Sequence, residues 1–275
     1  MSDFEREYYE EESFWEGDIL QDEANSERIR FTSKLIPGEV KTIADIGCGN
    51  GVFVNYLKEN IPALDIMAID RSHTALKYVK TEKKQGDIAA IPLADKSIDC
   101  ATCLEVIEHL PVAVFEKALD ELARISREYV IISVPYQERL EEKYNQCPSC
   151  STIFNYDLHL RNFDDERMKG LLNGRNFSHV ESHHLGVSTF YKGHYTFRKM
   201  FYSEQFRQWK SPICPLCGYK EEKRDSGNTM PQQVLSTGTN KGKRRVISLL
   251  TALPKAVWPK EKRYYWVIAL YKRTN

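Results

Sequence analysis

Residues 45–51 read DIGCGNG, between an apolar run at residues 40–44 and a helix-like run at residues 52–60. This pattern predicts a strand, a glycine turn and a helix. Glycine permits positive φ and lets a ligand approach the backbone without a Cβ in the way. The turn ends at a helix N-terminus, where N–H groups lack intrahelical partners. We expect Asp45, at the end of the strand, to accept backbone N–H bonds from the turn or to bind a ligand ammonium.

The glycine spacing distinguishes two classes of cofactor. A dinucleotide fingerprint, G-x-G-x-x-G, has its third glycine three residues after the second. Here Gly47, Gly49 and Gly51 are two residues apart, and Val52 occupies the third dinucleotide position. The pattern D-x-G-x-G-x-G instead resembles the first motif of class I S-adenosylmethionine-dependent methyltransferases. The structural alternative is a strand–helix turn that binds no ligand.

Four later segments follow the order expected of that family. Residues 64–69, LDIMAI, predict a second strand that ends at Asp70, where an acid can bind ribose hydroxyls. Gly86, Asp87 and Ile88 end a short third strand. Residues 91–110 resemble the fourth-strand region, with the strand at 98–103, and residues 129–135, YVIISVP, resemble the fifth strand.

The resemblance is to the broad type 11 (UbiE-like) group of small-molecule methyltransferases. It implies an α/β fold, with a Rossmann-like, seven-stranded, mostly parallel sheet and helices on both faces. It also implies S-adenosylmethionine as the cofactor and places an acid that reaches the adenine amino group at Asp87. The implied cofactor-binding residues are Asp45, Gly47, Cys48, Gly49, Asn50, Gly51, Asp70, Arg71, Asp87, Ile88 and Glu105.

The segment Glu105-Val-Ile-Glu108-His109 places two carboxylates and an imidazole on about one helical turn, just after the fourth strand. Small-RNA 3′-end and quinone O-methyltransferases resemble it. In that interpretation the three residues bind Mg²⁺ or Mn²⁺ together with His159. In metal-free type 11 enzymes, Glu105 lines the cofactor pocket. Glu108 and His109 are then catalytic candidates, with His109 positioning or deprotonating the acceptor. Both interpretations stay open.

Seven cysteines form two groups. Cys48, Cys100 and Cys103 are expected to be small buried hydrophobes. The motifs Cys147-Pro-Ser-Cys150 and Cys214-Pro-Leu-Cys217 supply four thiolates, the set that a tetrahedral structural zinc needs. Their separation exceeds the usual zinc-ribbon spacing. However, the motifs follow the fifth and sixth strands, which are parallel in the family fold, so both insertions leave the same edge of the sheet. Disulfides, which a cytosolic chain disfavours, and free thiols are the alternatives.

The chain divides into six predicted segments. These are a helical lead-in (1–39), the cofactor-binding core (40–135), an insertion with the first C-P-x-C motif (136–163), a helix and sixth strand (164–185), a long insertion with the second motif (186–262) and the last strand (263–275). Within the long insertion, residues 226–243 predict a polar loop.

The charge composition of the chain bears on which classes of binding partner it favours. Lys plus Arg and Asp plus Glu both number 39, so no global charge favours nucleic acid or an anionic membrane. Residues 189–209 mix aromatic and basic side chains, which favours a packed helix or substrate lid over a nucleic-acid surface. No long apolar run or signal peptide is evident, so we expect a cytoplasmic protein without a membrane span. The predicted activity is O- or N-methylation of a small molecule; the second hypothesis is a non-catalytic, zinc-bearing binding module.

Overall fold

A computed structural model describes residues 3–15, 22–191, 213–220 and 259–274. The predictions for residues 226–243, and for most of 189–209, lie outside the described residues.

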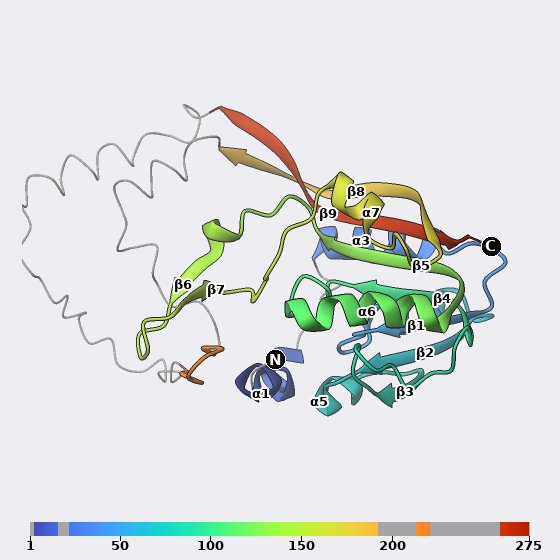
Figure 1. Ribbon diagram of the computed structural model, residues 1–275, viewed down its shortest axis with the longest axis horizontal. Coiled ribbons are helices and arrows are strands. Elements are labelled where there is room, and N and C mark those ends of the chain that lie inside the picture. Colours follow the sequence, from blue (N-terminus) through green and yellow to red (C-terminus); the bar gives the residue numbers. More distant parts are fainter. Residues whose placement is uncertain (1–2, 16–21, 192–212, 221–258, 275) are drawn as a thin grey trace, which may run out of the picture.

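A seven-stranded sheet forms the body of the molecule (Figure 1). Its order is β3-β2-β1-β4-β5-β9-β8. The first five strands in this order pair in parallel, and β9 pairs antiparallel to both of its neighbours. This confirms the predicted Rossmann-like, mostly parallel sheet. The strands are β1 (Thr42–Ile46), β2 (Asp65–Asp70), β3 (Glu82–Gln85), β4 (Ile98–Leu104), β5 (Ser126–Pro135), β8 (Phe177–Tyr191) and β9 (Lys260–Arg273).

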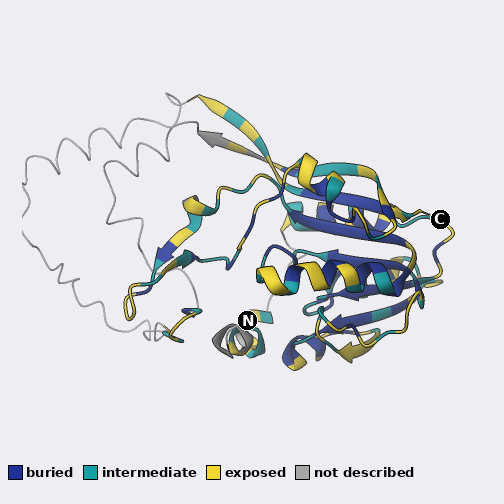
Figure 2. Ribbon diagram, in the orientation of Figure 1, coloured by how far each residue is buried: buried dark blue, intermediate teal, exposed yellow. Residues whose placement is uncertain are grey.

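Helices cover both faces of the sheet, and each face has its own buried cluster. One cluster includes α6 (Val112–Ile125) and α7 (Asp165–Gly170), and the other includes α3 (Glu23–Lys34) and α4 (Val52–Asn60). Central strands buried on both sides read as continuous apolar runs, and Figure 2 shows them as the buried layer. The shorter helices α1 (Asp3–Glu10) and α2 (Glu12–Trp15) contact α5 (His73–Leu76).

Strand register brings the predicted acids to one edge of the sheet. Asp45 pairs with Ala68 of β2 and Thr102 of β4, and β2 ends at Asp70. Because β1, β2 and β4 are parallel, their carboxyl ends meet at the same edge. In open α/β sheets, ligands bind in the crevice outside that edge.

The terminal hairpin is longer than predicted. The sequence predicts that the sixth-strand segment ends at residue 185 and that the last strand begins at residue 263, but β8 continues to Tyr191, which pairs with Lys260 of β9. The predicted end of the sixth strand falls just before Gly186, because glycine is a common residue at the ends of strands. In the structure a Cβ there would lie 2.6 Å from the Trp266 ring, so glycine allows this ring to pack against the strand. The insertion predicted at 186–262 therefore begins and ends in strand.

Other boundaries shift by a few residues. Helix α7 takes only Asp165–Gly170 of the segment 164–185, which was predicted to hold a helix and the sixth strand. Gly86 to Ile88 follow β3 and do not form its end. Such terminal differences are normal because the ends of elements depend on caps and neighbours.

The first insertion contains a small hairpin. The 3₁₀ helix η2 (Leu140–Lys143) leads into β6 (Tyr144–Gln146), which pairs antiparallel with β7 (Ile153–Asn155). Cys147 and Cys150 lie in the connection between these two strands. Among the described residues, no helix combines the length and apolar character needed to cross a bilayer.

Candidate active site

A cavity of about 660 Å³ opens at the carboxyl ends of the parallel strands. This volume is within the range of small-molecule and cofactor sites, about 300–1,000 Å³. Its wall combines the glycine turn, residues that follow β2, β3 and β4, the lead-in helices and the first insertion. Of the predicted cofactor-binding residues, only Gly51 does not line the cavity. The ten that line it are Asp45, Gly47, Cys48, Gly49, Asn50, Asp70, Arg71, Asp87, Ile88 and Glu105.

The glycine turn is a tight backbone cradle. Gly47, Gly49 and Gly51 have φ values of 77°, 53° and 79°. A Cβ on Gly47 would lie 2.5 Å from Val106, so a larger residue would disrupt the packing as well as the conformation. The Gly47 N–H donates to the Ile69 carbonyl at 2.7 Å, which ties the turn to β2.

Asp70, and not Asp45, fixes the turn. The Gly49 N–H donates to Asp70 Oδ2 at 2.8 Å, and the Ser72 N–H donates to Oδ1 at 2.8 Å. Asp45 instead contacts a neighbouring strand, because the Thr102 hydroxyl donates to Asp45 Oδ1 at 2.6 Å. The expectation that Asp45 accepts N–H bonds from the turn is therefore replaced by this side-chain contact. Its alternative role, as an acid facing a ligand, fits its place in the cavity wall.

Both acids are electrostatically unusual. Asp45 is 3% exposed, and burial raises its pKa to about 7, with the Asp70 carboxylate adding to the effect and the Thr102 hydrogen bond opposing it. Burial also raises the pKa of Asp70, against the two N–H groups that it accepts. A cation bound beside these carboxylates would stabilise their ionised forms.

The loop after β3 supplies a more open part of the wall. Asp87 is exposed, and its Oδ1 accepts the Ala89 N–H at 2.8 Å. Arg71 follows Asp70 and places its guanidinium 4.9 Å from the centre of the Tyr9 ring. The end of the cavity near β2 and β3 therefore offers hydrogen-bonding groups and an aromatic surface.

In the segment after β4, the Glu105 side chain has a different partner from those of Glu108 and His109. Glu105 adopts a positive φ of 58°, and its Oε1 accepts the Ser133 hydroxyl at 2.6 Å. The ligand atoms of Glu108, His109 and His159 lie within 4.8 Å of one another. The structure therefore assembles three of the four residues proposed for a divalent metal, whereas the Glu105 carboxylate is engaged with Ser133.

Glu108 and His109 contain unsatisfied buried atoms. Both Glu108 carboxylate oxygens and His109 Nδ1 lack hydrogen-bond partners within the described ranges. Burial, with Glu105 contributing, raises the Glu108 pKa well above its ordinary value. Burial lowers the His109 pKa to about 3, and His159 contributes to this shift. At neutral pH His109 is thus an uncharged imidazole. Its ring lines the cavity and lies 4.7 Å from the ring of His159.

An ion-pair network holds His159. Its Nδ1 contacts Glu138, and Lys143 bridges Glu138 and Asp157. Hydrogen bonds and charges from His159 and Lys143 lower the Glu138 pKa despite desolvation by burial. Sequence reasoning missed Glu138, Lys143 and Asp157, because no motif links these scattered residues to the β4 segment.

The lead-in helices form another wall that the motifs did not indicate. The cavity-lining residues of this wall are Tyr8, Tyr9, Phe14 and Trp15. The Trp15 ring packs on Gly49, and the Trp15 carbonyl accepts from Asn50 Nδ2 at 3.2 Å. Glu10 accepts the N–H groups of His73 and Thr74, each at 3.0 Å, which anchors α1 on α5. The signal in the sequence is the aromatic-rich stretch YYEEESFW, residues 8–15.

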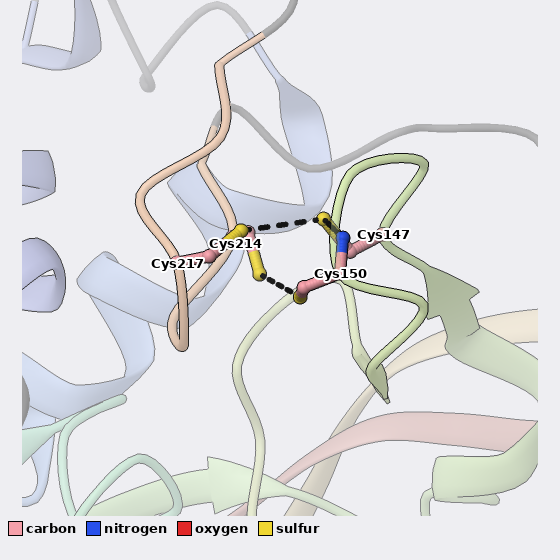
Figure 3. A group of neighbouring side chains, drawn as sticks. All are labelled: Cys147, Cys150, Cys214 and Cys217. Carbon is pink, nitrogen blue, oxygen red and sulfur yellow. Dashed lines mark hydrogen bonds between the residues drawn. The ribbon is translucent and has the colours of Figure 1, made fainter.

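The four cysteines of the C-P-x-C motifs meet in space although 63 residues separate the motifs. Cys147 Sγ lies 3.6 Å from Cys217 Sγ, and Cys150 Sγ lies 3.7 Å from Cys214 Sγ (Figure 3). Tetrahedral zinc with Zn–S bonds of about 2.3 Å requires S–S separations of about 3.8 Å. A disulfide bond is about 2.05 Å long, and all four thiols are free. Hydrogen bonds with Thr152 lower the Cys150 pKa to about 6, which favours the thiolate.

Comparisons with known proteins agree with this geometry. The methyltransferase domain family, type 11, matches residues 44–133. An uncharacterised protein of Methanocaldococcus jannaschii is 29% identical over 46% of this chain and 54% of its own length. The ubiquinone biosynthesis O-methyltransferase of Paraburkholderia phymatum is 33% identical over 32% of this chain and 42% of its own length. This chain therefore spans about half the length of these curated relatives.

Structural comparison supports the fold alone. The YcgJ protein of Bacillus subtilis superposes with a TM-score of 0.51 at 13% identity, covering 91% of this chain and 99% of that one. Together, the matched residues 44–133, the sheet order and the glycine turn at the carboxyl edge agree with a type 11 methyltransferase domain on a Rossmann-like fold.

Proposed function

We propose that this chain transfers a methyl group from S-adenosylmethionine to an oxygen or nitrogen atom of a small-molecule acceptor. The observation that carries the proposal is the pairing of the glycine cradle with two buried acids, Asp45 and Asp70, at one edge of the sheet. A cofactor that has an ammonium and a ribose would supply a cation and hydroxyl donors, the two kinds of group that carboxylates bind.

The proposed binding roles follow from position. Asp45 would face the ammonium, Asp70 the ribose hydroxyls, and Asp87 with Ile88 the adenine. When bound, S-adenosylmethionine supplies an electrophilic methyl group. The contribution of the protein is then mainly to hold the acceptor in line and to exclude water. Aromatic side chains of the lead-in, together with Tyr156 of the first insertion, suit a neutral acceptor with apolar surface.

His109 is proposed to position the acceptor. Its neutral imidazole lines the cavity, and Glu108 Oε1 lies 3.9 Å from its Nε2. With a pKa near 3, this imidazole is a weak proton acceptor at neutral pH, so we favour hydrogen bonding to the acceptor over full proton removal. Glu108 would set the orientation of His109.

A divalent metal is the second candidate for the same segment. The unsatisfied oxygens of Glu108 and the unsatisfied Nδ1 of His109 are atoms that a cation would satisfy. Glu108, His109 and His159 would hold Mg²⁺ or Mn²⁺, which would supply a positive charge beside the acceptor oxygen. Under this alternative the acceptor is an RNA end or a quinone precursor.

We also propose that Cys147, Cys150, Cys214 and Cys217 bind one structural Zn²⁺. Two sulfur–sulfur distances of 3.6 and 3.7 Å, with all four sulfurs within 4.8 Å of one another, support this proposal, as do the thiolate-favouring surroundings of Cys150. The ion would join the first insertion to residues 213–220, two short segments without a large core of their own. Metal binding would therefore contribute directly to their folding stability.

The test of the proposed activity is transfer of labelled methyl from S-adenosylmethionine to components of a fractionated cell extract, followed by mass spectrometry. We expect a labelled small molecule whose formation is lost in Asp45→Asn and retained in a surface control, Lys96→Ala. If the protein binds the cofactor but labels no fraction, the non-catalytic binding module becomes the better account. Labelled RNA would favour the second candidate.

A further inference from the structure

His159 lines the cavity from the first insertion, and a carboxylate lies behind its ring. Its Nδ1 contacts Glu138, and the side chains of His159 and Glu138 are only 10% and 9% exposed. A carboxylate accepts hydrogen bonds and cannot donate them, so Nδ1 is the nitrogen that carries the hydrogen. In a neutral imidazole the lone pair is then on Nε2, which is the nitrogen left for a ligand.

The Glu138 carboxylate is itself held in place. Lys143 contacts both Glu138 and Asp157, so one ammonium joins the two acids of the first insertion. A cation at this distance favours the ionised form of a carboxyl group. Glu138 is therefore a fixed hydrogen-bond acceptor, and it sets both the orientation and the tautomer of the His159 ring.

The backbone of the first insertion places this ring against the segment that follows β4. The Leu160 N–H donates to the Glu108 carbonyl at 2.9 Å. Leu158, the residue before His159, has a φ of 61°, which a bulky side chain rarely adopts. Backbone strain of this kind persists where the surrounding structure imposes it, often at functional sites. The His159 ring lies as a result 4.7 Å from that of His109, which also lines the cavity.

Methyl transfer to a hydroxyl or an uncharged amine releases the hydrogen of that group as a proton. His109 is proposed only to orient the acceptor, so a second group has to receive this proton. The ring beside it, with its lone pair on Nε2, has the chemistry and the position for that role.

We propose that His159, positioned by Glu138, accepts the proton of the acceptor through Nε2 during methyl transfer. This inference rests on the proposed function. The acceptor oxygen or nitrogen bonds to the methyl carbon as the carbon–sulfur bond breaks, and the electron pair of that bond leaves with S-adenosylhomocysteine. The hydrogen of the acceptor atom moves to Nε2 as a proton and passes to water after the product leaves.

The tautomer can be read without any acceptor. Nitrogen NMR of the protein with isotope-labelled histidine, with His159→Ala to assign the signal, should show hydrogen on Nδ1 and none on Nε2 at neutral pH. Glu138→Gln should shift this signal toward a mixture of tautomers, since an amide can donate as well as accept. The control is Glu141→Gln, the same change on an exposed residue of the first insertion, which should leave the signal unchanged. Hydrogen on Nε2 in the wild type would overturn the inference.

Mn²⁺ separates this role from metal binding, because a paramagnetic ion broadens the NMR signals of its ligands. One equivalent of Mn²⁺ should leave the His159 signal sharp. Selective broadening of that signal would assign the ring to a metal site and would also overturn the inference.

The labelled-methyl assay on the cell extract tests the chemistry. His159→Ala should lower turnover by about 10²–10⁴ while affinity for S-adenosylhomocysteine is unchanged, and added imidazole should restore part of the rate. Glu138→Gln should cause a smaller loss, and Glu141→Gln none. Full turnover in His159→Ala would overturn this inference alone and leave the proposed function standing. A wild type that labels no fraction would overturn the proposed function, and the inference with it.

Discussion

Asp45 links cofactor binding to pH at the residue scale. Its pKa, raised by burial from 3.8 to about 7, means that the empty site keeps a proton through much of the acidic range. Binding an ammonium favours the ionised carboxylate, so that proton must leave. We predict that affinity for S-adenosylhomocysteine rises by up to about tenfold per pH unit below pH 7. Calorimetry from pH 5.5 to 8 measures this, and Asp45→Asn should largely flatten the profile.

The Asp45 carboxyl group should have the opposite pH effect on the stability of the unliganded protein, which it lowers as the pH rises. Because its folded pKa is above the unfolded value of 3.8, the folded state binds more protons between about pH 4 and 7. The contribution of Asp45 to the free energy of unfolding therefore falls as pH rises through this window. Urea denaturation at pH 5 and pH 7.5 should show that the free energy of unfolding of the wild type, taken relative to that of Asp45→Asn, falls as the pH rises. Identical slopes would remove Asp45 as the source.

The Glu108 and His109 pair gives a test between its two proposed roles. If His109 positions the acceptor, His109→Ala should lower turnover by about 10²–10⁴ while cofactor affinity is unchanged, and chelators should have no effect. If a cation is bound, EDTA should abolish turnover and Mg²⁺ or Mn²⁺ should restore it. Turnover that ignores both the substitution and the chelator would leave this segment with a structural role only.

The cysteine loops give a prediction at the scale of elements. We expect about one zinc per chain by elemental analysis, four thiolate ligands, and protection of the thiols from alkylation. Cys214→Ser should release the metal and speed tryptic cleavage after Lys143 and Lys220. Ser149→Ala changes the same loop without removing a ligand, so it should retain the zinc. A metal-free protein prepared without chelators, with four freely reacting thiols, would contradict this prediction.

The lead-in helices should respond to the cofactor. Since α1 and α2 provide four aromatic side chains to the cavity wall, ligand contact should reduce their local opening. We predict slower amide hydrogen exchange in residues 3–15 when S-adenosylhomocysteine is added, with little change in α7, whose residues do not line the cavity. Saturating ligand with unchanged exchange in residues 3–15 would show that these helices do not contact it.

Local pattern explains which elements were predictable. The β1–turn–α4 unit follows from residues 40–60 because its apolar runs, glycines and acid are contiguous. The sheet order follows from the family resemblance. Glu138 and the aromatic side chains of the lead-in were not predicted as site residues. Their roles depend on contacts between distant segments, and such contacts leave no fixed spacing in the sequence. The hairpin length was missed because Gly186 has the local character of a strand end although it accommodates Trp266.

At the scale of the whole molecule, three separate parts of the chain enclose one cavity. The core supplies the acids and the glycine turn, α1 and α2 supply four aromatic side chains, and the first insertion adds Tyr156, Asp157 and His159. The ion pair between Glu11 and Lys220 also joins the lead-in to the second cysteine loop. This arrangement predicts that the insertions affect acceptor choice more than cofactor affinity, because the cofactor-binding acids all belong to the core.

The central claim is that the cavity binds S-adenosylmethionine, and calorimetric titration with S-adenosylhomocysteine tests it most directly. We predict one site per chain with a micromolar dissociation constant, about −8 kcal/mol. Asp70→Ala should weaken binding by about 1.5–3 kcal/mol through loss of charge-assisted bonds to the ribose. NAD should give no comparable signal, because the glycine spacing lacks the third dinucleotide position. Tight binding of NAD, with no heat from S-adenosylhomocysteine, would contradict the account.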